Sequence, residues 1–225
     1  NGFHDASNII APVIASRAMT PIQAVAIVAV FEFLGPVLGG TAVANTIGKF
    51  VTVDDVIADK AVVIILCGIV AAIVWNLGTW WIGIPSSSSH ALVGGLAGAV
   101  VVSVGADHVL WGFAELGKGH LTGVTKVLIG LVISPLIGFW VGFLLQKLTA
   151  SLLVRAKPTA NRTLRRSRFL TSAWLAFSHG ANDAQKSMGI ITLVLVLSGR
   201  ISDFAVPFWV ILTCASAITL GITQK

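Results

Sequence analysis

Long runs without a single charged side chain constrain this sequence more than any other feature. No Asp, Glu, Lys or Arg occurs in Ala61–Ala106, Val127–Gln146 or Phe204–Gln224, and Pro21–Gly48 is interrupted only by Glu32. A helix that crosses the hydrocarbon core of a bilayer needs roughly 20 apolar residues. Charged residues make up 11% of the 225-residue chain, whereas soluble domains carry about 25%. The runs therefore predict an all-α, multi-pass membrane helix bundle.

The apolar runs divide into six or seven predicted membrane segments. Pro85 is expected to break the backbone between the third and the fourth, because proline has no N–H and disfavours helix at the preceding residue. Whether the segment after Pro85 crosses once or forms a re-entrant hairpin stays open. The predicted segments are Asn1–Ala18, Pro21–Ala44, Lys60–Gly83, Ala91–Val104, Lys126–Leu148, Phe169–Leu197 and Pro207–Gly221.

Basic residues gather in one stretch of the chain. Seven of the 15 Lys and Arg fall between Lys147 and Arg168, with no acidic residue among them. A basic connection between two spans is typical of a cytoplasmic loop, so residues 149–168 are predicted as one. The basic residues are not spread over a face, which argues against nucleic-acid binding. Cys67 and Cys214 lie in apolar segments, which predicts neither a disulfide framework nor a metal site.

Glycines at four-residue spacing predict close contacts between helices, because small residues let two backbones approach. The spacing occurs three times within the predicted segments, at Gly35/Gly39, Gly94/Gly98 and Gly138/Gly142.

Two polar motifs recur at matched positions in the chain. "NGFHDASNIIAP" (Asn1–Pro12) and "HGANDAQKSMGI" (His179–Ile190) share Gly, any residue, His or Asn, Asp and Ala. A cytoplasmic basic loop makes the two motif-bearing segments antiparallel. Similar motifs on oppositely directed helices are typical of inverted-topology repeats, with broken helices at the bilayer midplane. The predicted division is 1–148 for most of a first repeat, 149–168 for the loop and 169–225 for the start of a second repeat.

Charged residues occur in the motif-bearing segments and in the second predicted span. Asp5, Glu32, Asp183 and Lys186 would together cost about 10 kcal/mol or more if all faced lipid. They are therefore expected to face the protein interior or a wet cavity, to pair or to bind ions. One alternative is an internal salt bridge between Asp183 and Lys186, which are three residues apart on a helix. It does not account for Asp5.

Four serines and a histidine interrupt the longest apolar run, in "PSSSSHALVGG" (Pro85–Gly95). Hydroxyls on unwound backbone at the start of a helix suit a tetrahedral oxyanion or a dehydrated cation, and the helix dipole there favours an anion. The alternative is that the serines only cap the helix and permit tight packing. His4, His90 and His179 fall inside the three motifs, where a histidine carries protons, bonds a substrate or satisfies a backbone carbonyl.

These motifs resemble the signature segments of the inorganic phosphate transporter (PiT) family. The likeness rests on "GFHDASN", "PSSSSHALVGG" and "HGANDAQKSMGII" and extends over nearly all 225 residues. Family members have two inverted halves, each with an Asp motif followed by a Pro–Ser/Thr-rich–His motif. Here the second half ends before its own Ser/Thr–His motif, and the sequence begins with Asn1. We therefore expect these residues to be part of a longer polypeptide that completes the binding site.

The resemblance implies roles for individual residues. The expected phosphate-binding residues are Ser87, Ser88, Ser89, Asn182 and Asn8. The expected cation- or proton-coupling residues are Asp5, Asp183, Glu32, His90 and His179. Two positions depart from the family pattern: His4 stands where many members have Asn, and Lys186 stands where the first motif has Asn8.

The function that the resemblance implies is phosphate symport by alternating access in the bacterial plasma (inner) membrane. The coupling cation is H⁺ or Na⁺, no cofactor or catalytic residue is expected, and a metal–phosphate complex as substrate and a homodimer are left open. Sulfate or another tetrahedral oxyanion is the alternative substrate. A serine hydrolase using Ser86–Ser89 with His90 or His179 would need a nucleophile elbow with flanking glycines, which "PSSSSH" lacks. A structural scaffold leaves Asp5 and Asp183 unexplained.

Overall fold

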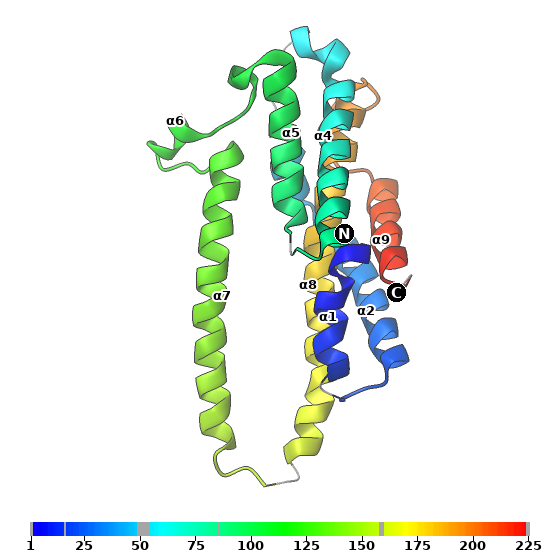
Figure 1. Ribbon diagram of the computed structural model, residues 1–225, viewed down its shortest axis with the longest axis vertical. Coiled ribbons are helices and arrows are strands. Elements are labelled where there is room, and N and C mark those ends of the chain that lie inside the picture. Colours follow the sequence, from blue (N-terminus) through cyan, green and yellow to red (C-terminus); the bar gives the residue numbers. More distant parts are fainter. Residues whose placement is uncertain (1, 16, 49–54, 85, 158–159, 224–225) are drawn as a thin grey trace. The chain divides into compact units, whose positions relative to one another are not determined.

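Every regular element in the described part of the chain is a helix (Figure 1). The computed structural model describes residues 2–15, 17–48, 55–84, 86–157 and 160–223, and only the backbone of residues 3–8, 48, 55–59 and 223. The chain forms two compact units, Asn1–Leu110 with Phe169–Lys225, and Trp111–Arg168. The predicted all-α class is confirmed, whereas the division into repeats stays a prediction.

Several helices have the length and composition of membrane spans. Among the described residues, Pro21–Leu38, Lys60–Ile82 and Gly123–Leu153 are long and apolar enough to cross a bilayer, and Ser88–Val104 and Phe208–Ile222 are shorter apolar helices. The first unit contains α1 (Gly2–Ala15), α2 (Pro21–Leu38), α3 (Ala42–Gly48), α4 (Asp55–Ile82), α5 (Ser88–Val104), the 3-10 helix η1 (Ala106–His108), the part of α8 (Ala160–Leu197) from residue 169, and α9 (Phe208–Thr223).

Helix α2 begins with a capping box and ends earlier than predicted. The Thr20 hydroxyl accepts from the Gln23 N–H at 3.3 Å, and the Gln23 side chain accepts from the Thr20 N–H at 3.0 Å, which satisfies two backbone donors at the helix start. The predicted segment ran to Ala44, but α2 ends at Leu38. Gly40 has a φ of +80°, a left-handed conformation that ends the helix, and α3 starts only two residues later.

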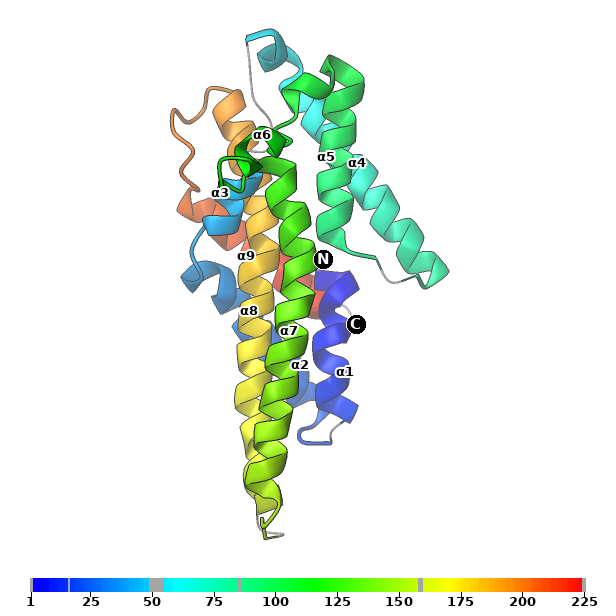
Figure 2. The ribbon, with the colours of Figure 1, turned by 90° about the vertical axis from the view of Figure 1, so that its left-hand side faces the viewer.

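Helices α4 and α5 form an antiparallel hairpin (Figures 1 and 2). The break between them is confirmed, although Pro85 itself lies outside the described residues. The helices touch through Gly68 and Gly95, where a Cβ on Gly95 would collide with the Gly68 carbonyl oxygen. The predicted contact through Gly94 and Gly98 is wrong, since a Cβ on either meets open space. A shift of one residue turns a helical side chain by about 100°, so the contact face passes through Gly95 instead.

Helix α8 packs against α1, α2 and α9. Ile9, Val28, Ala176 and Ile222, one from each of these four helices, form a fully buried apolar cluster. The predicted close contact at Gly35/Gly39 is confirmed, because a Cβ on Gly35 would collide with the Phe177 carbonyl oxygen of α8. Helices α1 and α8 run in opposite directions, as the topology count predicted (Figures 1 and 2).

The second unit contains α6 (Phe113–Leu116), α7 (Gly123–Leu153) and the first residues of α8. Thr125 fixes the start of α7, because its N–H and its hydroxyl both donate to the Trp111 carbonyl, at 3.0 and 2.6 Å. The irregular stretch between α7 and α8 is shorter than the predicted 149–168 loop, since α7 continues to Leu153 and α8 begins at Ala160. Lys, Arg and Leu are good helix formers and extend both helices into the basic stretch.

Candidate functional site

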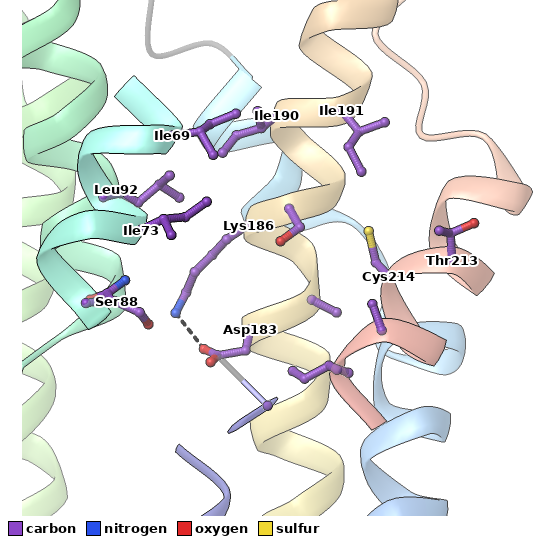
Figure 3. A pocket seen from close by; sticks show the side chains of 17 residues that line it. Ile69, Ile73, Ser88, Leu92, Asp183, Lys186, Ile190, Ile191, Thr213 and Cys214 are labelled. Atoms are coloured by element: carbon purple, nitrogen blue, oxygen red, sulfur yellow. Dashed lines mark hydrogen bonds and ion pairs between the residues drawn. The ribbon is translucent and has the colours of Figure 1, made fainter. Parts of the chain in front are cut away.

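A cavity of about 470 Å³ lies within the first unit (Figure 3). All three motifs contribute to its walls: Gly2 from the first motif, Ser88 from the serine segment, and Asp183 with Lys186 from the second motif. Residues far apart in sequence therefore meet at one place. The remaining lining residues are Ile69, Ala72, Ile73 and Asn76 of α4, Leu92 of α5, Ala184, Ser187, Ile190 and Ile191 of α8, and Thr213, Cys214, Ala217 and Ile218 of α9.

Close backbone approaches bring the motifs to the cavity. A Cβ on Gly2 would collide with the Ile218 carbonyl oxygen, so the first residue of the described chain packs directly against α9. In the second motif, a Cβ on Gly189 would lie 2.6 Å from the Ala44 carbonyl oxygen of α3. The Gln185 side chain also accepts from the Val43 N–H at 2.8 Å. The last two contacts hold the second motif against α3, and Ala184 and Met188 of the motif share an apolar cluster with Ala44 of α3 and Cys214 of α9.

An ion pair occupies the α8 wall of the cavity. Lys186 Nζ lies 2.5 Å from Asp183 Oδ1, and the two residues are 7% and 5% exposed. Their spacing of three residues places both on one face of the helix. The salt bridge predicted as an alternative for these two residues is therefore confirmed. It also places both charges on the wall of a cavity, where a ligand can reach them.

Asp183 belongs to a longer row of neighbouring ionisable groups. Glu32 of α2 is fully buried, and its Oε1 lies 2.5 Å from His179 Nδ1. The other ring nitrogen, His179 Nε2, lies 3.6 Å from Asp183 Oδ2. Glu32 reaches α8 because Gly180 leaves room for the α2 backbone: a Cβ there would collide with the Glu32 carbonyl oxygen. The row Glu32–His179–Asp183–Lys186 thus connects the α2–α8 contact with the cavity.

Two buried oxygen atoms at the cavity have no hydrogen-bond donor among the described residues. They are Asp183 Oδ2 and Asn76 Oδ1, and both residues line the cavity. Most buried polar atoms in proteins are hydrogen-bonded. Two exceptions on the walls of one cavity indicate a site whose acceptors are completed by water or by a ligand that donates protons.

The serine segment divides between structural roles and the cavity. The Ser86 hydroxyl accepts from the Trp75 indole N–H at 3.0 Å, and the Ser87 hydroxyl caps α5 by accepting from the His90 N–H at 3.4 Å. The predicted capping alternative therefore holds for Ser87. Ser88 is the hydroxyl that lines the cavity, on the wall opposite Asp183 and Lys186 (Figure 3).

The other predicted site residues lie at different distances from this cavity. Glu32 and His179 connect to it through Asp183, whereas Ser89, His90 and Asn182 are not among its described lining residues. His90 and Asn182 are exposed. The side chains of Asp5 and Asn8 lie outside the described residues.

Asn76 was missed by the sequence analysis, although a signal was present. It is the only Asn or Gln in the uncharged run Ala61–Ala106. A polar amide in a membrane segment is expected to face a protein interior or a cavity rather than lipid, and Asn76 does so. The pairing of Glu32 with His179 was also missed, because these residues are 147 positions apart.

Buried charges on the wall of an internal cavity in a helical membrane bundle are typical of substrate or ion pathways. A model of the phosphate transporter family matches residues 1–224. The chain belongs to this family, as its motifs predicted.

Similar proteins agree with this assignment. The chain is 40% identical over 223 residues to a probable low-affinity inorganic phosphate transporter of Rhizobium meliloti and to one of Bacillus subtilis. In both cases the match covers 98% of this chain and 63% of the relative, so the chain spans less than two thirds of their length. It is 35% identical over 217 residues to the low-affinity inorganic phosphate transporter PitB of Escherichia coli, covering 87% of this chain and 43% of that protein.

A solved structure shares the fold. Its title is "The sodium-dependent phosphate transporter", and it superposes with a TM-score of 0.83 at 24% identity, covering 98% of this chain and 70% of that one. The chain therefore has the same fold as this structure.

Proposed function

We propose that the protein containing this chain transports inorganic phosphate together with a cation, H⁺ or Na⁺, and that phosphate binds in the cavity of the first unit. One observation carries the proposal: the three family motifs contribute Gly2, Ser88 and Asp183 to the same cavity. The names of the relatives, low-affinity inorganic phosphate transporters, support phosphate as the substrate.

The walls of the cavity offer hydrogen-bond donors and a positive electrostatic potential, both of which stabilise a bound oxyanion. The Ser88 hydroxyl and the first amides of α5 present donors, and the positive end of the α5 dipole favours an anion there. We assign Ser87, Ser89, Asn182 and Asn8 to the same binding site in a state of the transport cycle in which the walls close around the ion. Alternating access by two inverted repeats supplies such a closing movement.

The acidic residues hold the coupling cation beside the anion. Asp183, with Asp5 of the first motif, binds the cation or proton, and Glu32, His90 and His179 are the proton-handling groups. A cation and an anion that share a cavity each raise the affinity for the other, and this coupling is reciprocal. Symport follows, because the loaded cavity carries less net charge than the cavity with either ion alone.

Phosphate fits the cavity better than sulfate does. Asn76 Oδ1 is a buried acceptor without a donor among the described residues. Hydrogen phosphate and dihydrogen phosphate carry protons that they donate to such acceptors, whereas sulfate carries none at neutral pH. A site built to receive a hydrogen bond rejects the analogue that lacks the donor, because the buried acceptor is then left without a partner.

The proposal includes a location and an assembly. We place the protein as a multi-pass protein in the bacterial plasma membrane, and propose free phosphate or a metal–phosphate complex as its substrate. A homodimer is the proposed assembly.

Phosphate uptake by the full-length protein in proteoliposomes tests the proposed function. An inward proton gradient and an inward sodium gradient are imposed separately, with excess sulfate as the competitor. We expect one of the gradients to drive uptake and sulfate to leave it unchanged. Uptake that sulfate blocks would favour the sulfate alternative, and no uptake under either gradient would contradict phosphate symport.

A further inference from the structure

Lys186 is a cavity residue to which the proposed function gives no role. Its ammonium lies beside Asp183, on the motif position that Asn8 occupies in the first motif. We propose that Lys186 is a built-in cation that exchanges between two partners: it pairs with Asp183 in the empty cavity and with phosphate once Asp183 carries a proton. This inference rests on the proposed function, since it names how phosphate and its coupling ion act on one another.

The two oxygens of Asp183 have different surroundings. Oδ1 accepts from Lys186 Nζ at 2.5 Å, whereas Oδ2 is buried without a hydrogen-bond donor among the described residues and faces His179 Nε2 at 3.6 Å. A proton therefore binds at Oδ2 without displacing Lys186 first. Once Oδ2 is protonated, the carboxyl is neutral, so the ammonium loses the attraction between opposite charges and keeps only a hydrogen bond to a neutral group.

Charge balance in the cavity couples the two events. The pair of Lys186 and Asp183 has no net charge, so a phosphate monoanion bound beside it leaves one uncompensated negative charge. A buried charge without a partner costs several kcal/mol. Protonation of Asp183 restores neutrality, because the ammonium then balances the phosphate. Proton and phosphate thus bind together more favourably than either alone, with no sodium ion required at this motif.

The lysine side chain is suited to the exchange. It carries three donors on a flexible four-carbon stem, and the cavity that it enters has a volume of about 470 Å³. A water molecule takes up about 30 Å³ in the liquid, so the space admits a tetrahedral ion with some of its water. Ser88 lies on the opposite wall (Figure 3), where its hydroxyl supplies a second contact to an ion held by Lys186.

His179 is the donor of the proton. As an imidazolium it hydrogen-bonds to Glu32 through Nδ1–H and passes its Nε2 proton to Asp183 Oδ2. The imidazole, whose side chain is 22% exposed, then takes up a replacement proton from outside the row, so the row gains one positive charge for each phosphate bound. The gap of 3.6 Å closes by a small side-chain movement or through one water. Among the described lining residues, the only further titratable group is Cys214 of α9; α4 and α5 contribute the non-ionising Asn76 and Ser88. The side chains of His4 and Asp5 on α1 lie outside the described residues.

Phosphate binding by the purified full-length protein, measured by titration calorimetry at mildly acidic and neutral pH, tests the exchange. The variants are Lys186→Gln, Asp183→Asn and the double variant, with Lys157→Gln as a matched control at an exposed position. We expect Lys186→Gln and the double variant to bind phosphate at least about tenfold more weakly than the wild type, the loss expected for one charged hydrogen bond. Lys157→Gln should bind like the wild type.

Asp183→Asn separates the exchange from a simple binding role for the lysine. It mimics the protonated carboxyl, so it should bind phosphate at least as tightly as the wild type at both pH values. The ratio of the phosphate affinity of Asp183→Asn to that of the wild type at the same pH does not depend on the ionisation of phosphate itself. This ratio should increase as the pH rises, because only the wild type has to take up a proton at Asp183. Coupled uptake by Asp183→Asn should be lost, because the site for the proton is gone.

The binding results distinguish a failure of the proposed function from a failure of the exchange. A wild-type protein that binds no phosphate would contradict the proposed function itself. Wild-type binding that Lys186→Gln retains in full, or binding that Asp183→Asn loses, would overturn the exchange. If Lys186→Gln does not fold, as judged by size-exclusion chromatography, the comparison of Asp183→Asn with the double variant decides, because these two differ only at Lys186.

Discussion

Helix α4 and the part of α8 from residue 169 belong to the same unit and distribute their side chains in opposite ways. Helix α4 turns large apolar residues outward, including Val63, Leu66 and Trp81. Helix α8 buries polar ones, namely Ser172, Asp183, Gln185, Lys186 and Thr192. In a water-soluble protein the two patterns would be reversed. In lipid an outward apolar residue costs nothing, whereas a charge is tolerated only where protein or a wet cavity surrounds it.

The difference indicates which side chains determine how the helices of this chain pack. Apolar residues on α4 contact lipid in both the assembled and the separated state, so they contribute little to helix packing. Polar groups and glycines on α8 have specific partners, and a change there leaves a buried group without one. Substitutions on α8 should therefore be costly and substitutions on the outer face of α4 should be mild.

The largest effect is expected from breaking the buried ion pair. Lys186→Met leaves the Asp183 carboxylate without its partner and should lower the free energy of unfolding by about 3–5 kcal/mol. Asp183→Leu combined with Lys186→Met removes both charges and should recover most of this loss. Chemical denaturation of the detergent-solubilised protein measures both. If the double variant is as unstable as Lys186→Met, the loss of stability does not come from the unpaired Asp183 carboxylate.

A methyl group at the α2–α8 contact should have the next largest effect. Gly180→Ala directs a Cβ at the Glu32 backbone and should cost about 1–3 kcal/mol, as overpacking does. It should also weaken phosphate uptake, because it separates Glu32 from His179. Gly98→Ala is the matched control, since a Cβ there meets open space. Equal effects of the two substitutions would contradict the close contact between α2 and α8.

The hydrogen bond that ties the serine segment to α4 should contribute less. Trp75→Phe removes the indole donor to Ser86 and should cost about 0.5–1.5 kcal/mol. Ser86→Ala should cost about as much, and the double variant no more than either single one. Trp81→Phe, at a more exposed position of the same helix, is the control. Additive losses in the double variant would show that the two side chains do not act on one another.

The smallest effect is expected on the outer face of α4. Leu66 is half exposed, and Leu66→Ala should change the free energy of unfolding by less than about 0.5 kcal/mol, as surface substitutions do. The same denaturation experiment measures it. A loss as large as that of Gly180→Ala would mean that this face packs against protein rather than lipid.

Much of the fold could be predicted because the membrane restricts the alternatives. Uncharged runs such as Val127–Gln146 admit only spanning helices in a chain of this composition. The helix ends were less predictable. Gly39 and Gly40 end α2 within an uninterrupted apolar run, and α8 begins within the basic stretch, because backbone conformation rather than hydropathy decides both positions.

The site was predicted in part, and the difference has a physical reason. Asp183 and Ser88 stood out because polar residues in apolar segments need partners, and both line the cavity. The partners themselves were not visible in the sequence: Glu32 meets His179 through a glycine contact between two helices. The serines show the opposite case, since three of four similar residues in a row have different roles: a cap, a hydrogen bond to α4 and a cavity wall.

The central claim, that phosphate binds where the three motifs meet, is tested most directly by a cysteine at Ser88. The measurement is the rate at which a small charged thiol reagent modifies Ser88→Cys in the full-length protein, with Cys67, Cys214 and any other cysteine replaced by serine. The account predicts that phosphate slows the reaction several-fold and that sulfate does not. A rate unchanged by phosphate, in a variant that still transports it, would place the binding site elsewhere.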